Sequence, residues 1–176
     1  MYDLLLEDEG RAILFVTVAN FAEGNLDAAL EMMKHPGTLL GLGDGGAHYG
    51  IICDSSFPTF MLTYWARDRK GERLEMPWIV RALSQEPAQA VGLNDRGRIA
   101  VGYKGDLNVI DRDKLELHTP DIRRDLPAGG KRLMQRATGF EATICSGVII
   151  SRNGKPTGAL PGRLIRGSQP APELIA

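Results

Sequence analysis

The pattern of apolar and polar positions predicts a strand, a helix and a second strand in the first part of the chain. Residues 12–18 (AILFVTV) form a short apolar, β-branched run that is typical of a strand buried on both faces. A helix is predicted over residues 25–35, with Pro36 as its stop signal, and a second strand over residues 38–43 (TLLGLG). Such a unit has parallel strands, so Asp44 is expected at the carboxyl end of the second one.

Helical spacing dominates the next segment. Residues 57–67 carry apolar side chains at positions i, i+3, i+4, i+7 and i+8, which predicts an amphipathic helix. Residues 76–85 predict another helix, and residues 87–91 a short one that Gly92 closes. The chain is therefore expected to be of the α/β class up to this point.

Short β-prone runs punctuated by glycine follow. Strands are predicted over residues 98–101, 107–110 and 142–150. Asn153-Gly154 is the strongest hairpin signal, and Pro156 restricts the returning strand to an edge or a start.

Prolines, glycines and arginines crowd residues 119–136, which are predicted to form an exposed loop.

Charge and cysteine usage narrow the class of partner. The 21 basic and 22 acidic residues leave a formal net charge of -1 without long blocks of one sign, so we expect no nucleic-acid and no membrane partner. Cys53 and Cys145 lie far apart and suit neither a disulfide framework nor a thiolate zinc cluster. The first residues lack the features of a signal peptide, and no apolar run is long enough to span a membrane. A cytoplasmic protein that acts on a small molecule is expected.

Gly41–Gly46 (GLGDGG) matches the G-x-G-x-x-G pattern of dinucleotide-binding loops. Such a loop needs a helix directly after its third glycine, whereas residues 47–53 intervene here, and Asp44 would repel a pyrophosphate. We therefore expect no nucleotide cofactor. Two interpretations of Asp44 stay open: the glycines clear space for a ligand or metal at a strand end, or the carboxylate caps the following turn.

Neighbouring residues do not complete a known catalytic motif. His48 and Cys53 follow Asp44, but a zinc site needs at least three protein donors at a suitable spacing. Ser55 and Ser56 lie in no G-x-S-x-G elbow, and their position before a helix predicts capping rather than nucleophilic chemistry. His48 stays open between a polar loop residue and a functional one.

Four segments together carry a resemblance to a known family: LLGLGDGGAHYG, SFPTFMLTYWARDR, DRGRIAVGYKGDLNVID and TGALPGRLIRG. They resemble the C-terminal portion of amidohydrolase-superfamily proteins of the N-acyl-D-amino-acid deacylase (D-aminoacylase) kind. The resemblance implies that residues 1–94 form the last strands and helices of a (β/α)₈ TIM-type barrel. It further implies that residues 95–166 form part of a small β-sandwich, with residues 167–176 as a flexible tail.

The resemblance also implies a catalytic role for Asp44. In that family an aspartate at the end of the eighth barrel strand accepts a proton from the metal-bound water, and Asp44 matches its position. The resemblance implies Zn²⁺ as the cofactor, with Asp44 as its base or as one of its ligands. The family's H-x-H motif and remaining ligands have no counterpart here, so we expect most ligands to lie elsewhere and the chain to be inactive alone.

One departure bears on the substrate. Where D-aminoacylases carry a His-Pro-Arg element, this chain has AHYGIICDSSFP, in which His48 is the candidate substrate-binding residue. The resemblance therefore implies hydrolysis of a carbon-nitrogen bond other than a peptide bond, in an N-acyl amino acid or a related amide. The alternative hypothesis is a non-catalytic interaction module that self-associates or pairs with a separate N-terminal segment, because incomplete barrel strands leave unpaired edges.

Overall fold

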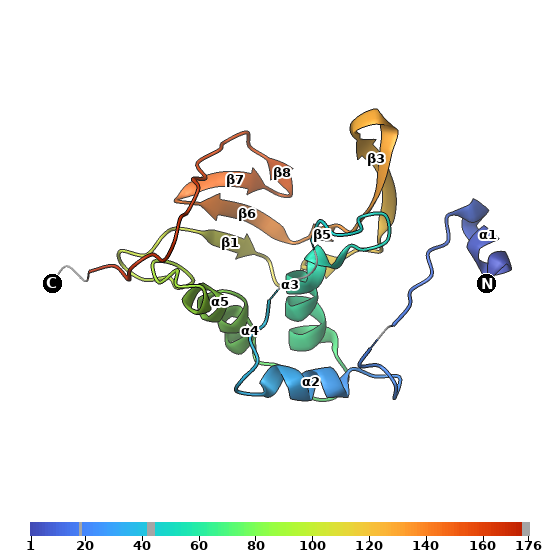
Figure 1. The fold of residues 1–176 in the computed structure, drawn as a ribbon, viewed down its shortest axis with the longest axis horizontal. Coiled ribbons are helices and arrows are strands. Elements are labelled where there is room, and N and C mark those ends of the chain that lie inside the picture. Colours follow the sequence, from blue (N-terminus) through green and yellow to red (C-terminus); the bar gives the residue numbers. More distant parts are fainter. Residues whose placement is uncertain (18, 42–44, 174–176) are drawn as a thin grey trace. The chain divides into compact units, whose positions relative to one another are not determined.

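The computed structural model describes residues 1–17, 19–41 and 45–173, and the chain divides into two compact units (Figure 1). The N-terminal unit comprises Met1–Thr38 and the C-terminal unit Leu39–Ala176. No helix in the described ranges is both long enough and apolar enough to cross a membrane.

The N-terminal unit contains two helices, α1 (Tyr2–Gly10) and α2 (Asp27–Lys34). The last turn of α1 is distorted, because Asp8 and Glu9 have positive φ angles. α2 confirms the predicted helix. The Asn25 side chain accepts a hydrogen bond from the Asp27 backbone N–H at 2.8 Å and so fixes the first turn.

The two strands predicted around α2 are wrong for the residues that the structure describes. Residues 12–17 and 38–41 form no strand, and residues 18, 42 and 43 lie outside the described part. Phe15 is 89% exposed, which is the opposite of the burial that a parallel strand needs on both faces. The mixed helix and strand content is compatible with the α/β class, whereas the barrel and the sandwich stay predictions.

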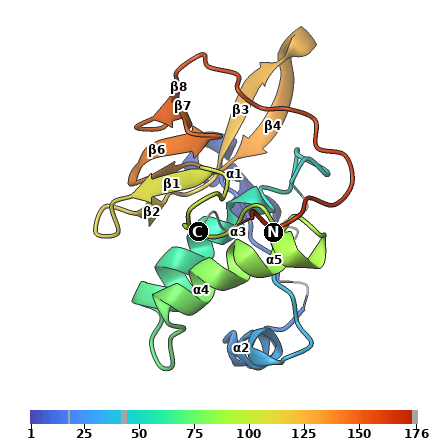
Figure 2. The ribbon, with the colours of Figure 1, turned by 90° about the vertical axis from the view of Figure 1, so that its left-hand side faces the viewer.

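The helices of the C-terminal unit begin with η1 (Asp54–Ser56) and continue through α3 (Phe57–Phe60) into η2 (Met61–Asp68), a π-helical segment. This run confirms the predicted helix over residues 57–67. α4 (Met76–Leu83) and α5 (Gln85–Ala90) follow and confirm the other two helices. In Figure 2, η2, α4 and α5 lie on one side of the strands.

The core of the C-terminal unit lies mainly among these helices. Ile79 is fully buried in α4, and Trp65 in η2 is 2% exposed. The guanidinium of Arg69 lies 4.9 Å from the centre of the Trp65 ring, so a buried cation packs on the aromatic face. The other buried apolar residues of this unit are Met61, Leu74, Ala82, Ala88, Leu115 and Ala142.

The main sheet is antiparallel, with the strand order β1-β6-β7-β8. Its strands are β1 (Leu107–Ile110), β6 (Phe140–Cys145), β7 (Val148–Arg152) and β8 (Lys155–Pro156). β1 confirms the predicted strand over residues 107–110. The segment 142–150, predicted as one strand, instead contains the end of β6, a turn and the start of β7. Residues 98–101 form no strand, so that prediction is wrong.

The hairpin predicted at Asn153-Gly154 is confirmed. Both residues have positive φ angles, 49° and 73°, which the tight turn between β7 and β8 requires. Pro156 lies in β8, the two-residue strand at the edge of the sheet, where a missing N–H is tolerated.

The predicted loop over residues 119–136 is wrong, because most of it is a second hairpin. β3 (Asp121–Leu126) pairs with β4 (Gly130–Met134) across η3 (Pro127–Gly129), and β2 (Glu116–Leu117) pairs with β5 (Ala137–Thr138). Pro127 and Gly129 lie in the turn, Gly130 begins β4 and Pro120 precedes β3. The cross-strand ion pair Arg132–Asp125 takes the place of the apolar alternation that identifies a strand.

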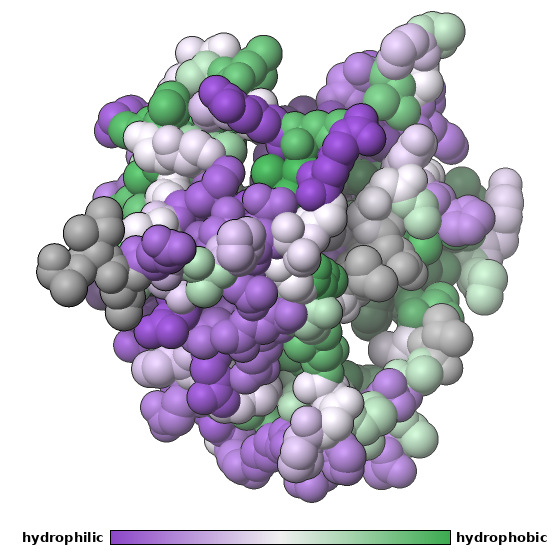
Figure 3. Space-filling view, turned by 60° about the vertical axis from the view of Figure 1, so that its left-hand side comes forward, coloured by the Kyte–Doolittle hydropathy of each residue, from purple (hydrophilic) through white to green (hydrophobic). Residues whose placement is uncertain are grey.

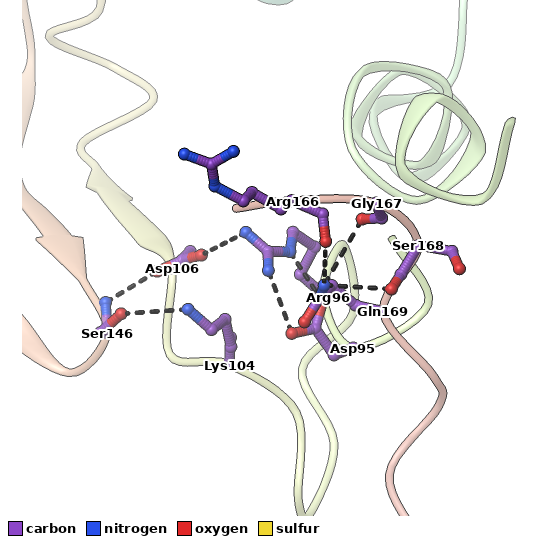
Figure 4. Close-up of polar contacts among 9 residues, drawn as sticks. All are labelled: Asp95, Arg96, Lys104, Asp106, Ser146, Arg166, Gly167, Ser168 and Gln169. Carbon is purple, nitrogen blue, oxygen red and sulfur yellow. Dashed lines mark hydrogen bonds and ion pairs between the residues drawn. The ribbon is translucent and has the colours of Figure 1, made fainter. Parts of the chain in front are cut away.

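Residues 95–111 (DRGRIAVGYKGDLNVID), called the DRG segment below, connect the helices to the sheet (Figure 4). Asp95 and Arg96 form a bidentate ion pair at 2.8 and 3.0 Å, and Arg96 also lies 3.9 Å from Asp106. Asp106 in turn accepts the backbone N–H of Ser146, next to the main sheet, at 2.7 Å. Gly97 completes the junction, because a Cβ there would lie 2.8 Å from the Cα of Gln85. The motif therefore acts as a structural connector.

Residues 157–169, called the closing segment below, join the same junction through their last residue. Gln169 donates its backbone N–H to Gly92 O at 2.8 Å, and its carbonyl accepts from Asn94 N at 3.0 Å. This residue of the predicted tail is thus paired with the chain near the end of α5. Its side-chain amide donates to the carbonyl oxygens of Arg166, Gly167 and Ser168 (Figure 4). The domain limits at residues 94/95 and 166/167 stay predictions.

Candidate functional site

Asp44, the predicted catalytic residue, lies outside the described residues, so the site is built from the segment that follows it, residues 45–56. Two glycines open this segment. Gly46 has a φ of +95°, a backbone conformation that residues with a side chain rarely adopt. A Cβ on Gly45 would approach the Cβ of Ser55 to 3.3 Å, so the two ends of the segment lie close together.

His48, the candidate substrate-binding residue, forms the turn of this segment. It has a positive φ of 45°, and its carbonyl oxygen accepts from Ile51 N at 2.8 Å and from Ile52 N at 3.0 Å. The residue is exposed and does not line the pocket described below. Its role in substrate binding stays a prediction.

Residues 45–56 are attached to the edge of β4. Leu133 N donates to Tyr49 O at 2.5 Å, so the segment pairs with the strand through the backbone. Gln135, just after β4, makes a second attachment, because its Oε1 accepts from Ser56 Oγ at 2.6 Å. Its Nε2 donates to His118 O at 2.9 Å, so both ends of the carboxamide are engaged. Gln135 therefore holds the segment that follows Asp44 against the β3–β4 hairpin.

This contact changes the interpretation of Ser56. The serine occupies the N-cap position of α3, as predicted, but its side chain caps no helical N–H. Two acceptors lie within reach of its hydroxyl, Gln135 Oε1 at 2.6 Å and Cys53 O at 3.2 Å, and its single proton is donated over the shorter contact, to Gln135. The bond is made to a residue far away in the sequence, which capping preference alone does not reveal.

A pocket of about 370 Å³ lies between the segment and β4. Burial, with Asp54 as a smaller cause, raises the pKa of the Cys53 thiol and so keeps it neutral. Arg132 forms two hydrogen bonds with Asp125, at 2.8 and 2.7 Å, and these hold the pKa of the carboxyl below its usual value. The pocket is lined by Gly45, Gly46, Tyr49, Ile52, Cys53, Asp54, Ser55, Arg132, Leu133, Met134 and Gln135.

Sequence reasoning missed the half of this pocket that β4 supplies. Arg132 and Gln135 fall in the stretch that was predicted to be an exposed loop. The available signal was the turn sequence PAGG at residues 127–130, which is flanked by two short runs that pair as strands.

A metal centre is not formed by the residues that the structure describes. Within the described ranges, no three histidine, cysteine, aspartate or glutamate side chains are close enough together to hold an ion. His35 instead accepts the backbone N–H of Gly37 at 3.0 Å, just past α2, and His118 Nδ1 lies 3.7 Å from Glu116. The described donors therefore do not fit a metal site.

Comparison with protein families gives one match, which covers both sides of the pocket. A model described as "Amidohydrolase family" matches residues 10–151. The chain belongs to the amidohydrolase family. Its segment 45–56 and strand β4 both lie inside the matched residues. No curated protein and no solved structure matches the chain.

Membership of the amidohydrolase family makes the protein a hydrolase of a generally metal-dependent kind. The prediction of an amidohydrolase is thereby confirmed. Amidohydrolases usually bind a metal, but the described residues of this one do not bring a donor set together. No catalytic step is therefore derived through a metal ion. The resemblance to D-aminoacylases and the identity of the ion as Zn²⁺ stay predictions.

Proposed function

We propose that the protein is a deacylase of the amidohydrolase family that cleaves the amide bond of an N-acyl amino acid or a related amide. The observation that carries this proposal is the family match over residues 10–151, which contains the glycine segment after Asp44 and the pocket beside it. A pocket with apolar and polar walls suits a substrate that has an acyl group at one end and a carboxylate at the other.

Asp44 is the proposed proton-transferring residue. Gly45 and Gly46, its immediate successors, line the pocket, so the chain approaches the proposed substrate at this point. Amide hydrolysis needs a base that takes a proton from the attacking water and an acid that delivers one to the leaving amine. One carboxyl group performs both transfers in turn. In this proposal the metal that amidohydrolases usually bind would be Zn²⁺, although the described residues bring no donor set for it together.

Release of free amine from N-acyl amino acids tests the proposal. We expect the protein to release methionine from N-acetyl-methionine. Treatment with a chelator should abolish this release, and addition of Zn²⁺ should restore it. Parallel assays of the D and L substrates decide between a D-aminoacylase and a deacylase of other stereochemistry. Absence of amine release from every N-acyl amino acid tested, with Zn²⁺ bound, would contradict the function.

Exposed apolar side chains favour a second candidate, an interaction module. In the DRG segment Ile99 is 90% and Val101 85% exposed, and in the closing segment Leu160 is 94% and Leu164 77% exposed. On the face in Figure 3, hydrophobic residues form several separate areas among hydrophilic ones. Exposed apolar side chains that gather into one patch are typical of surfaces that bind another protein segment, and these four residues are candidates for such a patch.

Light scattering tests this second candidate. If the exposed side chains mediate self-association, the 19.2 kDa chain should elute with a mass of at least two copies, and replacing Leu160 and Leu164 with serine should return the mass of one. A mass of one chain at every concentration would contradict self-association and leave the deacylase proposal unaffected.

A further inference from the structure

Residues 159–166, in the middle of the closing segment, carry an interaction surface outside the candidate site. We infer that they bind an extended segment of another protein as an added antiparallel strand, and that this partner carries both apolar side chains and carboxylates. This surface deepens the second candidate function, the interaction module, on which the inference rests.

The backbone of residues 160–165 is free to pair. These residues belong to no helix or strand, and none of them forms a backbone–backbone hydrogen bond within the described ranges. The chain bends on either side of them, at Gly158 and at Gly167, which both have positive φ angles. Figure 2 shows the run between these bends as a long red trace that leads from β8 toward α5. A row of unpaired N–H and C=O groups is the surface to which a partner adds a strand.

Both ends of this run are attached to the rest of the C-terminal unit. At one end, Thr157 donates its backbone N–H to Ile150 O at 2.9 Å. At the other end, Gln169 forms the two backbone hydrogen bonds described above. Because the ends are fixed before a partner arrives, strand pairing costs less conformational entropy here than it would in a free tail.

Side chains along the run alternate between an inner and an outer face. Pro161 and Ile165 are half-buried, whereas Leu160 is 94% and Leu164 77% exposed. This period of two is that of a strand, in which residues four apart point the same way. Gly162 lies between the leucines, and no described atom beyond its chain neighbours lies within 4 Å of the position that a Cβ would take there. The outer face is therefore apolar and open to a partner.

Pro161 determines which edge of the run can pair. Successive residues of a strand direct their N–H and C=O groups to opposite edges, so those of Leu160, Gly162 and Leu164 point to the same edge. Pro161 has no N–H and leaves a gap in the other edge. A partner strand should therefore pair with the three even-numbered residues, all of which keep their donors.

The charges of the run define the chemistry of the partner. Arg163 and Arg166 are exposed, and neither forms an ion pair with the residues that the structure describes. In Figure 4 the guanidinium of Arg166 points away from the other labelled residues. Residues 157–172 contain no aspartate or glutamate. A second copy would bring two more arginines to the strand pair, whereas carboxylates on a different partner would form favourable cross-strand pairs. The charges therefore favour an acidic partner over self-association.

A designed peptide, acetyl-Glu-Thr-Val-Glu-Thr-Thr-Val-amide, tests the inference. When it pairs in antiparallel register with its middle Thr-Thr step beginning opposite Gly162, the valines face Leu160 and Leu164. In the same register the glutamates face Arg163 and Arg166.

NMR spectroscopy of the isotope-labelled full chain reports the pairing residue by residue. On addition of the peptide at about millimolar concentration, the amide signals of Leu160, Gly162 and Leu164 should shift and their exchange with solvent should slow. The amides of Arg163 and Ile165, on the other edge, should continue to exchange. Unchanged signals of the even-numbered residues would overturn the inference.

Two variants at one position and a second peptide locate the effect. Gly162→Pro removes a donor from the pairing edge and should weaken binding about tenfold or more, whereas Gly162→Ala meets open space and should bind as the wild type does. Replacing both glutamates of the peptide with glutamine should weaken binding about fivefold. The signals of the helices show whether each variant keeps its fold. Equal affinity of the two glycine variants, or of the two peptides, would overturn the proposed mode of binding.

Light scattering separates this inference from the functions proposed above. A mass of one copy together with peptide binding would support the acidic partner and refute self-association. A mass of two copies, with slow exchange of the even-numbered amides in the absence of peptide, would mean that a second copy occupies the edge and would overturn the inference. Neither outcome depends on amine release, so the deacylase proposal is tested independently.

Discussion

Asp44→Asn should lower kcat at least a hundredfold in the active protein while KM changes little. Asparagine has nearly the same shape but cannot take up or deliver a proton in the neutral pH range, and loss of a general acid-base group typically costs a factor of about 10²–10⁴. The acidic limb of the pH profile of kcat/KM should disappear as well, because that limb reports the ionisation of the base. Steady-state kinetics of amine release between pH 5 and 9 checks both effects.

Zinc content and a matched variant separate the possible roles of Asp44. A base that does not bind the metal leaves the zinc stoichiometry unchanged in Asp44→Asn, whereas a metal ligand lowers it. Asp113→Asn makes the same change at an exposed position outside the pocket lining and should keep the wild-type kcat. Near-normal turnover of Asp44→Asn would refute the catalytic role altogether.

Local signals predicted the parts of the fold that depend on neighbouring residues in the sequence. The helix over residues 57–67 follows from apolar spacing alone, and the turn at Asn153-Gly154 from the positive φ angles that these two residues tolerate. The β3–β4 hairpin was missed because its strands are stabilised by ion pairs and by pairing with each other. Neither source of stability appears as an alternation of apolar residues.

The strands predicted on either side of α2 failed for a different reason. An apolar run such as residues 12–17 becomes a buried parallel strand only if other strands lie beside it, and the described residues supply none. The candidate site shows the same dependence on distant partners. The sequence pointed to Asp44, which stays a prediction, and to the glycines that line the pocket. The opposite wall comes from Arg132–Gln135, some 90 residues later, and only the tertiary contact brings it into the pocket.

Trp65→Ala should destabilise the C-terminal unit by about 3–5 kcal/mol, the range for removing a buried aromatic side chain from a core. Trp65 is 2% exposed, and its ring carries the guanidinium of Arg69, which is itself only 5% exposed. The substitution therefore leaves a cavity and also removes the aromatic face from a buried cation, a contact worth about 0.5–2 kcal/mol. Unfolding in urea, followed by circular dichroism, measures the change in the free energy of unfolding.

Trp78→Ala is the matched control for this prediction, since it deletes the same side chain from α4 at a half-buried position. Less apolar area is lost from the core there, and we expect less than half of the destabilisation that Trp65→Ala causes. Trp65→Phe should recover part of the loss, because a smaller ring still fills some of the space and still faces Arg69. Equal losses from the two alanine variants would mean that Trp65 contributes no more to the core than an ordinary half-buried tryptophan.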